Sequence, residues 1–406
     1  MPKRNPTRGI TLPKGFRAAG VTCGIKPSGK PDLALIVADV PCAAAGVFTQ
    51  NKVPGAPVQV GKQHLRSGVA QAIICNSGIS NVATGKPGIE DAKAMAKHVA
   101  AMIHCKPNHV LPCSTGVIGV RLPIEKILTG IKTAAGELTA SPRADRNAAN
   151  AIITTDLATK AAQQTLTLNG KKITLGGVAK GSGMIAPNMA TMLVFITTDV
   201  AISSKMLKQA INLSVNADAS FNRMSVDHDT STSDSLLVMA SGLANNRTIK
   251  TAGQPFEKFT QALTALCQEF THQVIWDGEG ATRIFRVKVK GAASQADANR
   301  VGKAVVGSPL VKTAVHGCDP NWGRLAMAVG KSGAKIDQTK LSIEIGHLPV
   351  MKAGVNVPAP LGKLNRHMKS KEVQFTINLG LGKHKTEWLG CDLSREYIAI
   401  NADYTT

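Results

Sequence analysis

The segment 180–198 restricts the fold of this chain more than any other part of its sequence. Residues 180–190 (KGSGMIAPNMA) contain glycine and proline and are typical of a loop. Residues 192–198 (MLVFITT) form an apolar run rich in β-branched side chains, which predicts a buried strand. The junction falls at Ala190 and Thr191. We therefore expect a threonine that a core strand anchors on one side and that a loop leaves accessible on the other.

A threonine in this position is suited to nucleophilic chemistry. A hydroxyl is a weak nucleophile until a base removes its proton. If the peptide bond before Thr191 were cut, the residue would carry both the hydroxyl and a free α-amine that can act as the base. A terminal amine has a reference pKa of about 7.7 to 8.0, so roughly a tenth to a fifth of it is unprotonated at pH 7, against about 0.04% of an ordinary lysine. The amine of Thr191 is therefore the better base than Lys180.

Short apolar runs and amphipathic segments alternate along the rest of the chain, which predicts a mixed α/β fold. The predicted strands cover residues 33–38, 71–75, 110–113, 192–198, 283–290, 373–378 and 396–400. The predicted helices cover residues 89–103, 124–131, 203–214, 256–270 and 294–306. Residues 165–175 predict a β-hairpin, because Asn169 and Gly170 form a dipeptide that two-residue hairpin turns favour.

The length of 406 residues exceeds what one hydrophobic core usually spans, so we expect two core-bearing units, which a hydrophobic content of 43% can fill. The first residues, MPKRNPTR, lack the apolar core of a secretory signal, and no window approaches a membrane span. We expect a cytoplasmic protein with no membrane partner. The eight cysteines include no C-x-x-C pair, which favours reduced thiols over a zinc site or a disulfide framework.

The formal net charge of +22 raises the question of a nucleic-acid partner. Lysine and arginine are scattered singly or in pairs, and aromatic residues make up only 3%, too few to stack with the bases of a single strand. We therefore expect no nucleic-acid partner. Such a charge can raise the local concentration of anionic substrates such as dicarboxylates, and a basic, solvated surface explains it equally well.

Ordered motifs along nearly the whole chain resemble the ornithine acetyltransferase family of arginine biosynthesis, whose members cleave themselves at an Ala-Thr bond. In chain order these motifs are GFRAAGVTCGIKPSGKPDLALIVAD, CNSGISNVATG, STGVIG, KGSGMIAPNMATML, VDHDTSTSDS, GEGATR, CDPNWGR and INADYTT. The resemblance implies a layered αββα sandwich of the self-processing N-terminal-threonine acyltransferase type, with a second, smaller α/β unit. It also implies that cleavage separates an alpha chain, 1–190, from a beta chain, 191–406, that the halves fold together, and that two of each form a heterotetramer.

The same resemblance assigns roles to single residues. Cleavage would fall between Ala190 and Thr191, Thr191 would be the nucleophile, and Thr115 and Gly116 would form the oxyanion hole. These two suit that task, because glycine lets a backbone N–H face the site and threonine adds a hydroxyl donor. The family's substrate contacts fall on Thr154, Lys180, Thr191, Glu279, Asn401 and Thr406.

The side-chain chemistry fits these assignments. Glu279 can hold an ammonium group, Lys180 a carboxylate, and Thr154 and Asn401 an amide or an α-carboxylate. Without the resemblance, the Ser-Thr-Gly and Gly-Glu-Gly segments would be ordinary turns and Lys180 a solvated lysine. The hydroxyl-rich segment 227–234 belongs to the family pattern, but its residues suggest no chemical role beyond a self-hydrogen-bonded turn.

Together these features predict a self-processing glutamate N-acetyltransferase. Thr191 would take acetyl from N-acetylornithine, ornithine would leave, and glutamate would collect acetyl from the covalent acetyl-enzyme in a ping-pong reaction. No metal or organic cofactor is required, because the acyl donor is itself a substrate; in a bifunctional, multifunctional member acetyl-CoA would be a second donor. Two alternatives remain open. One is an amidohydrolase or aminopeptidase that uses the same nucleophile with water as acceptor, and the other is a basic binding protein.

Overall fold

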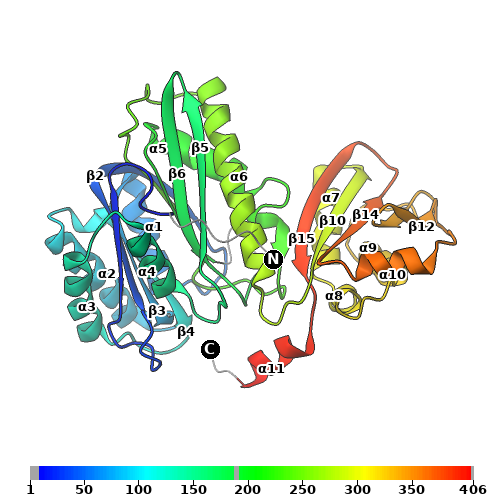
Figure 1. The fold of residues 1–406 in the computed structure, drawn as a ribbon, viewed down its shortest axis with the longest axis horizontal. Coiled ribbons are helices and arrows are strands. Elements are labelled where there is room, and N and C mark those ends of the chain that lie inside the picture. The colour runs from blue at the N-terminus through cyan, green and yellow to red at the C-terminus, as the bar shows by residue number, and fades with distance from the viewer. Residues whose placement is uncertain (1–8, 187–191, 404–406) are drawn as a thin grey trace.

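Residues 9–186 and 192–403 are described in the computed structural model, and they form a large and a smaller α/β unit (Figure 1). The strands of the large unit are β1 (Phe16–Val21), β2 (Leu33–Phe48), β3 (Val69–Ile79), β4 (Val110–Val117), β5 (Lys160–Leu168), β6 (Lys171–Lys180), β7 (Leu193–Thr198) and β9 (Ser235–Ala240). Its helices are α1 (Ala56–His64), η1 (Leu65–Ser67), α2 (Gly85–Met102), η2 (Pro107–His109), α3 (Ile124–Gly136), α4 (Pro142–Ile152), α5 (Ser204–Val215), η3 (Phe221–Arg223) and α6 (Gln254–Trp276). Within the described ranges, no helix combines the length and the apolar character that a membrane crossing requires.

Strand β2 is the element at which the large sheet folds back on itself. The sheet has eight strands in the order β4-β3-β2-β9-β7-β6-β5, with β1 also paired to β2. Residues 33–37 of β2 pair with β3, and residues 43–48 pair with β9. The register with β3 is interrupted between Val37 and Cys42, where Pro41 has no N–H to donate. The strand is therefore longer than the predicted 33–38, and it passes from one half of the sheet to the other.

Three apolar cores give the large unit its layers. The inner core lies between the two halves of the sheet and contains Ile36, Ile73, Phe195 and Leu237. Helices α2 and α3 cover the outer face of β1, β2, β3 and β4, and helices α5 and α6 cover the outer face of β5, β6, β7 and β9. The order of layers is helix, sheet, sheet, helix, so the predicted αββα sandwich is confirmed.

The smaller unit has its own sheet and core. Its strands are β10 (Ile284–Ala292), β11 (Ser342–Ile345), β12 (Leu348–Lys352), β13 (Val355–Asn356), β14 (Glu372–Asn378) and β15 (His384–Cys391), and its helices are α7 (Gln295–Val306), α8 (Pro309–His316), α9 (Trp322–Gly330) and α10 (Leu361–Met368). The short strand β8 (Met224–Ser225) joins this sheet beside β15, in the order β13-β12-β11-β14-β10-β15-β8. A separate apolar core fills the smaller unit, which confirms the predicted second α/β unit.

The hairpin prediction is confirmed, and one strand prediction is wrong. Strands β5 and β6 are joined at Asn169 and Gly170, whose φ angles of 47° and 76° are those of a type I′ turn. Residues 396–400, predicted as a strand, lie in helix α11 (Arg395–Asp403). No residue of α11 is buried, so the alternation of its apolar residues does not mark a sheet face. The Ser394 hydroxyl accepts a hydrogen bond from the Tyr397 amide at 3.1 Å, which caps the first turn of the helix.

Strands from both sides of the Ala190 and Thr191 position are interleaved in the large sheet. Strands β7 and β9 follow this position in the sequence, and they lie between β2 and β6, which precede it. Strand β7 pairs with β6 on one side and with β9 on the other, and all six of its residues are buried. The sheet therefore contains strands from both parts of the chain.

Removing the ring of Phe195 should test the importance of the inner core. Phe195 is fully buried in β7, so Phe195→Ala should lower the free energy of unfolding by about 3 to 5 kcal/mol. Leu213→Ala is the control, because Leu213 on α5 is 52% exposed and its loss should cost less than about 1 kcal/mol. Urea denaturation followed by circular dichroism measures both, and equal effects would contradict the assignment of Phe195 to a close-packed core.

Candidate active site

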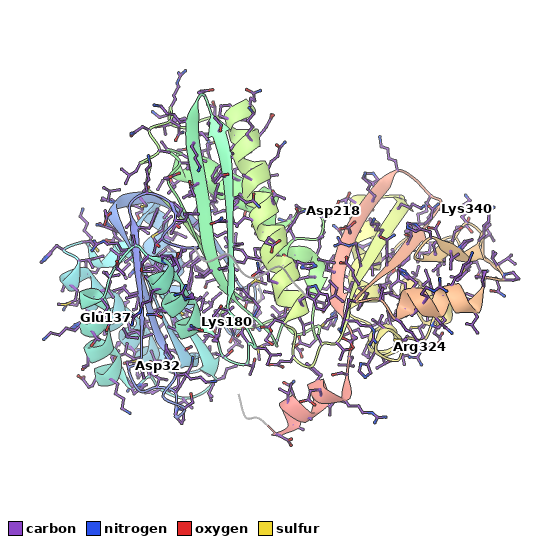
Figure 2. The ribbon with its side chains drawn as sticks, viewed as in Figure 1. Asp32, Glu137, Lys180, Asp218, Arg324 and Lys340 are labelled. Atoms are coloured by element: carbon purple, nitrogen blue, oxygen red, sulfur yellow. The ribbon has the colours of Figure 1, made fainter. Side chains whose placement is uncertain are left out.

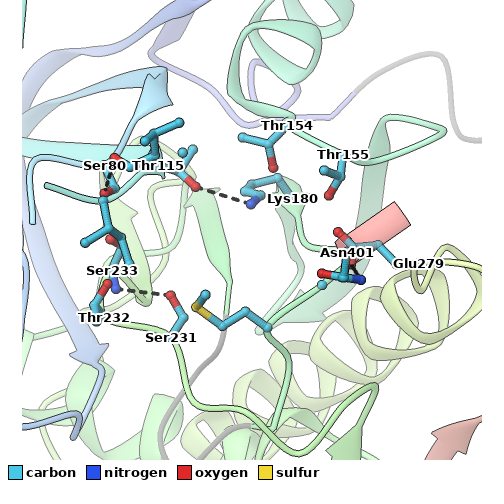
Figure 3. Close-up of a pocket in the computed structure, with 15 residues that line it drawn as sticks. Ser80, Thr115, Thr154, Thr155, Lys180, Ser231, Thr232, Ser233, Glu279 and Asn401 are labelled. Carbon is cyan, nitrogen blue, oxygen red and sulfur yellow. Dashed lines mark hydrogen bonds between the residues drawn. The ribbon is translucent and has the colours of Figure 1, made fainter. Parts of the chain in front are cut away.

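A cavity of about 110 Å³ lies where segments from distant parts of the chain meet (Figure 3). Six of the residues proposed from the sequence line it: Thr115, Gly116, Thr154, Lys180, Glu279 and Asn401. Residues Ala190, Thr191 and Thr406, which the sequence analysis also proposed, lie outside the described residues. The fold therefore brings together all of the proposed residues that the structure describes.

The end of β4 supplies Thr115 and Gly116. The parallel register of β3 and β4 is irregular here, because Ile79 lies opposite both Thr115 and Val117. Gly116 has a φ of 127°, and a Cβ at this position would lie 2.3 Å from the carbonyl carbon of Gly78. Only glycine fits this close approach of two strands. The sequence predicted that the strand ends at residue 113, whereas β4 continues through the pair and holds it in the sheet.

Lys180 is the last residue of β6 and lies at the end of the β5–β6 hairpin (Figure 2). Its Nζ donates a hydrogen bond to Thr115 Oγ1 at 3.2 Å. Figure 3 shows Lys180 between Thr115 on one side and Glu279 with Asn401 on the other. The cavity thus has a cation near its middle and a carboxylate at one side, which suits a molecule that carries both charges.

Glu279 and Asn401 form the other side of the cavity. Glu279 is 8% exposed, and its Oε2 accepts a hydrogen bond from Asn401 Nδ2 at 3.0 Å. A Cβ on Gly183 would lie 2.3 Å from Glu279 Oε2, so this glycine makes room for the carboxylate. Asn401 belongs to α11, so this helix brings the chain back to the cavity after the smaller unit (Figure 1).

A buried cluster that the sequence analysis missed holds these segments in place. The ammonium group of Lys160, whose side chain is 2% exposed, lies 2.7 Å from Asp156 Oδ1 and 2.5 Å from Asp277 Oδ2. Asp156 also accepts the amides of Thr154, at 3.1 Å, and Gly181, at 2.7 Å. Burial would raise the pKa of the Asp156 carboxyl, but Lys160, Lys180 and these hydrogen bonds outweigh it and lower that pKa to about 2.

The backbone of Asp277, the second acidic residue of this cluster, extends the same support to the loop after β6. The Ser182 hydroxyl donates to the Asp277 carbonyl oxygen at 2.6 Å, and the Glu279 amide donates to the Ser182 carbonyl oxygen at 3.1 Å. The sequence contained a signal for the cluster, because Asp156 ends the same ITTD segment as Thr154, with Lys160 four residues later. The signal was missed because nothing in the sequence shows that these charges are buried.

The hydroxyl-rich segment 227–234 has a more definite structural role than the self-hydrogen-bonded turn that its residues suggested. Asp227 accepts the amides of Met184 at 2.6 Å and Ile185 at 2.7 Å. Thr230 Oγ1 donates to the Ala186 carbonyl oxygen at 3.0 Å. The segment therefore fixes residues 184–186, directly before position 187, and residues 231–233 line the cavity.

Asp234 is a further buried carboxyl group that the sequence analysis did not single out. It is 2% exposed, and its Oδ2 has no hydrogen-bond partner in the parts of the chain that the structure describes. Burial raises the pKa of the Asp234 carboxyl well above its ordinary value. The next residue, Ser235, donates its amide to the Met192 carbonyl oxygen at 3.0 Å, so Asp234 lies beside the start of β7. A carboxyl group with a raised pKa takes up a proton more readily than an ordinary aspartate.

The chemistry of the cavity is that of hydroxyl, amide, ammonium and carboxylate groups. Within residues 9–186 and 192–403, no three histidine, cysteine, aspartate or glutamate side chains are grouped so that they could hold a metal ion. In the cavity, the Thr115 hydroxyl, the Gly116 amide and the Lys180 ammonium group can donate hydrogen bonds to a developing oxyanion. Glu279 can hold an ammonium group.

Comparisons with known proteins show which family this sequence is similar to. A model of the ArgJ family matches residues 17–406. The arginine biosynthesis bifunctional protein ArgJ of Dehalococcoides mccartyi is 43% identical over 403 residues, covering 99% of this chain and 98% of that protein. The protein of the same description from Symbiobacterium thermophilum is 44% identical over 400 residues, with 98% of each covered. A crystal structure of ornithine acetyltransferase with ornithine, from Mycobacterium tuberculosis, is 42% identical, with a TM-score of 0.42 over 45% of this chain and 97% of that one.

Neutralising Asp156 should destabilise the protein in a pH-dependent way. Asp156→Asn should lower the free energy of unfolding at pH 7 by about 2 kcal/mol or more, because the buried Lys160 ammonium loses one of its two carboxylates. The wild-type advantage is present above the unfolded-state pKa of about 4 and is lost as the pH falls toward the folded-state pKa of about 2. Urea denaturation at several pH values should show that the difference in the free energy of unfolding between the wild type and Asp156→Asn becomes smaller as the pH falls.

The matched control is Asp39→Asn, because Asp39 forms an ion pair with Arg17 in which both side chains are nearly half exposed. Its effect should stay below about 0.5 kcal/mol at every pH. A deficit for Asp156→Asn as small as that of the control would contradict the proposed structural role of the cluster.

Proposed function

The chain belongs to the ArgJ family of arginine-biosynthesis acyltransferases, and from this premise we propose that it is a glutamate N-acetyltransferase that takes acetyl from N-acetylornithine. One observation carries the proposal. The six described residues expected at such a site, Thr115, Gly116, Thr154, Lys180, Glu279 and Asn401, line one cavity, although they are spread from β4 to α11. In the sequence, the segment that follows Lys180 leads to Ala190 and Thr191.

The first proposed step is self-cleavage. The Thr191 hydroxyl attacks the Ala190 carbonyl carbon, the peptide C–N bond breaks, and the acyl group moves to the threonine oxygen while the proton that the hydroxyl loses passes to the nitrogen. Water then hydrolyses this ester, which leaves a new carboxylate on residue 190 and a free α-amine on Thr191. The Thr115 hydroxyl and the Gly116 amide stabilise the tetrahedral oxyanion, and one such donor contributes about 3 to 4 kcal/mol. The Asp234 carboxyl, whose pKa burial raises, lies beside the start of β7 and can relay the hydroxyl proton to the nitrogen.

The second proposed step is acetyl transfer. The α-amine of Thr191 accepts the hydroxyl proton as the oxygen attacks the acetyl carbonyl of N-acetylornithine. The amide C–N bond breaks, the proton passes to the leaving nitrogen, and ornithine departs from an acetyl-Thr191 enzyme. The amine of glutamate attacks this ester, the acyl C–O bond breaks, the proton that the amine loses passes to the Thr191 oxygen, and N-acetylglutamate leaves. The same oxyanion donors serve both halves of the reaction, and the acetyl donor is a substrate, so the reaction needs no metal or organic cofactor.

The charges of the cavity support amino acids as substrates. Lys180 can bind the α-carboxylate and Glu279 the ammonium group, while Thr154 and Asn401 supply hydrogen bonds. Thr406 would complete the set. The relatives are described as bifunctional, and we extend the proposal to acetyl-CoA as a second acetyl donor.

The arrangement of the large sheet supports a complex of the two products. Because β7 and β9 lie between β2 and β6, separation of chains 1–190 and 191–406 would break strand pairs on both sides and expose the inner core. We propose that the two chains stay together after cleavage and that two of each form a heterotetramer.

Intact-mass measurement tests the cleavage. Purified wild-type protein should give two chains, 1–190 and 191–406, whereas Thr191→Ala should give one uncut chain because its side chain has no nucleophile. Thr167→Ala, an exposed position on β5, should be cut like the wild type. Cleavage of Thr191→Ala at the same bond would refute the proposed self-processing.

Product analysis separates transfer from hydrolysis. With N-acetylornithine and glutamate, N-acetylglutamate should appear in step with ornithine; release of acetate at that rate would instead identify an amidohydrolase. Glu279→Gln should lower kcat/KM by about 10 to 100-fold, because an ammonium group loses a charged hydrogen-bond partner. Glu269→Gln, exposed on α6, should leave kcat/KM unchanged. An unaltered kcat/KM in Glu279→Gln would exclude the role given to that carboxylate.

A further inference from the structure

A second cavity, of about 590 Å³, lies on the large unit and shares no lining residue with the candidate active site. It is bounded by the second part of β2, by the end of α1 with η1, and by the start of α5. Its volume falls in the range of about 300 to 1,000 Å³ that is typical of small-molecule sites. Nothing in the proposed acyl transfer uses it.

Four basic side chains surround this cavity: Lys62, Arg66, Lys205 and Lys208. All four are exposed, and no acidic residue lines the cavity within the described residues. In the same part of the chain, none of the four forms an ion pair with a carboxylate. Positive charges that face one cavity without a counter-charge repel one another, and a bound anion would relieve this repulsion.

The backbone brings these basic segments together. Gly68 follows η1 with a φ of 68°, and a Cβ there would lie 2.5 Å from Ser204 Oγ, so only glycine allows η1 to lie this close to α5. Ser204 and Lys205 are the first two residues of α5 and line the cavity. The Ser203 hydroxyl already accepts a hydrogen bond from the Met206 amide, so only the amides before Met206 and the positive dipole end of the helix are left to favour a phosphate.

The remaining wall of the cavity is apolar. Phe48, Leu65, Ala44 and Ala45 line it, and Lys62 Nζ lies 5.9 Å from the centroid of the Phe48 ring. An inorganic anion would leave this wall without contacts, whereas a ligand with an organic part could cover it.

We propose that this basic cavity binds a small molecule that carries two or more phosphate groups on an organic part, that is, a nucleotide-like ligand. Four positive charges exceed what one carboxylate neutralises, and the planar guanidinium of Arg66 can bind two phosphate oxygens at once. The phosphates lie at the start of α5, and the organic part covers Phe48 and Leu65. The four basic residues of this site contribute to the net charge of +22.

Calorimetric titration of the purified full-length protein tests this proposal with three probes: ATP, coenzyme A and inorganic pyrophosphate. At least one of the two nucleotides should bind, and pyrophosphate should bind about tenfold or more weakly because it lacks the organic part. The affinity should fall as the concentration of sodium chloride is raised.

The triple variant Arg66→Ala/Lys205→Ala/Lys208→Ala should bind the nucleotide about tenfold or more weakly than the wild type. All three side chains are exposed, so the variant should keep the wild-type circular dichroism spectrum.

The matched control is Lys331→Ala/Lys335→Ala/Lys363→Ala, which removes three exposed positive charges from the smaller unit and should bind like the wild type. Failure of both nucleotides to bind the wild type would overturn the proposal. So would a triple variant that binds as tightly as the wild type, because the ligand would then sit elsewhere. Equal affinities for pyrophosphate and the nucleotides would overturn the role given to the apolar wall.

Discussion

The ammonium group of Lys160, buried between the carboxylates of Asp156 and Asp277, is the interaction on which the candidate active site depends. A buried charge is costly unless it is paired and hydrogen-bonded, so the segments that carry these three groups have few alternative arrangements. One carboxylate accepts the amides of Thr154 and Gly181, and the backbone next to the other holds Ser182. The cluster therefore fixes the loop that leaves β6 before any substrate is present, and such preorganisation is what oxyanion chemistry requires.

The layers of the large unit explain how this loop reaches a site made by the whole chain. The sheet turns back at β2, so the ends of β4 and β6 meet near the same cavity although they belong to opposite halves. The smaller unit then returns the chain through α11, which adds Asn401. Residues from both sides of the Ala190 and Thr191 position line the cavity, and strands from both sides build the sheet.

Local chemistry made part of this predictable from the sequence. The Asn169-Gly170 turn, the apolar run of β7 and the amphipathic helices follow from short-range rules. The site residues were predicted from motifs that this sequence shares with the ornithine acetyltransferase family. Long-range burial was not predictable: the alternation at 396–400 looks like a sheet face but belongs to an exposed helix, and the charges of Asp156 and Lys160 look like ordinary surface charges. Gly116 looked like a turn residue because its close contact with Gly78 depends on the pairing of two strands.

The central claim is that the chain beginning at residue 191 carries the acetyl group between its two substrates. Intact-mass measurement of the purified enzyme, stopped by acid after mixing with N-acetylornithine and without glutamate, tests it most directly. The account predicts that chain 191–406 gains the mass of one acetyl group, that chain 1–190 does not, and that addition of glutamate before the acid removes the gain. An enzyme that turns over while chain 191–406 keeps its mass, or an acetyl group on chain 1–190, would contradict it.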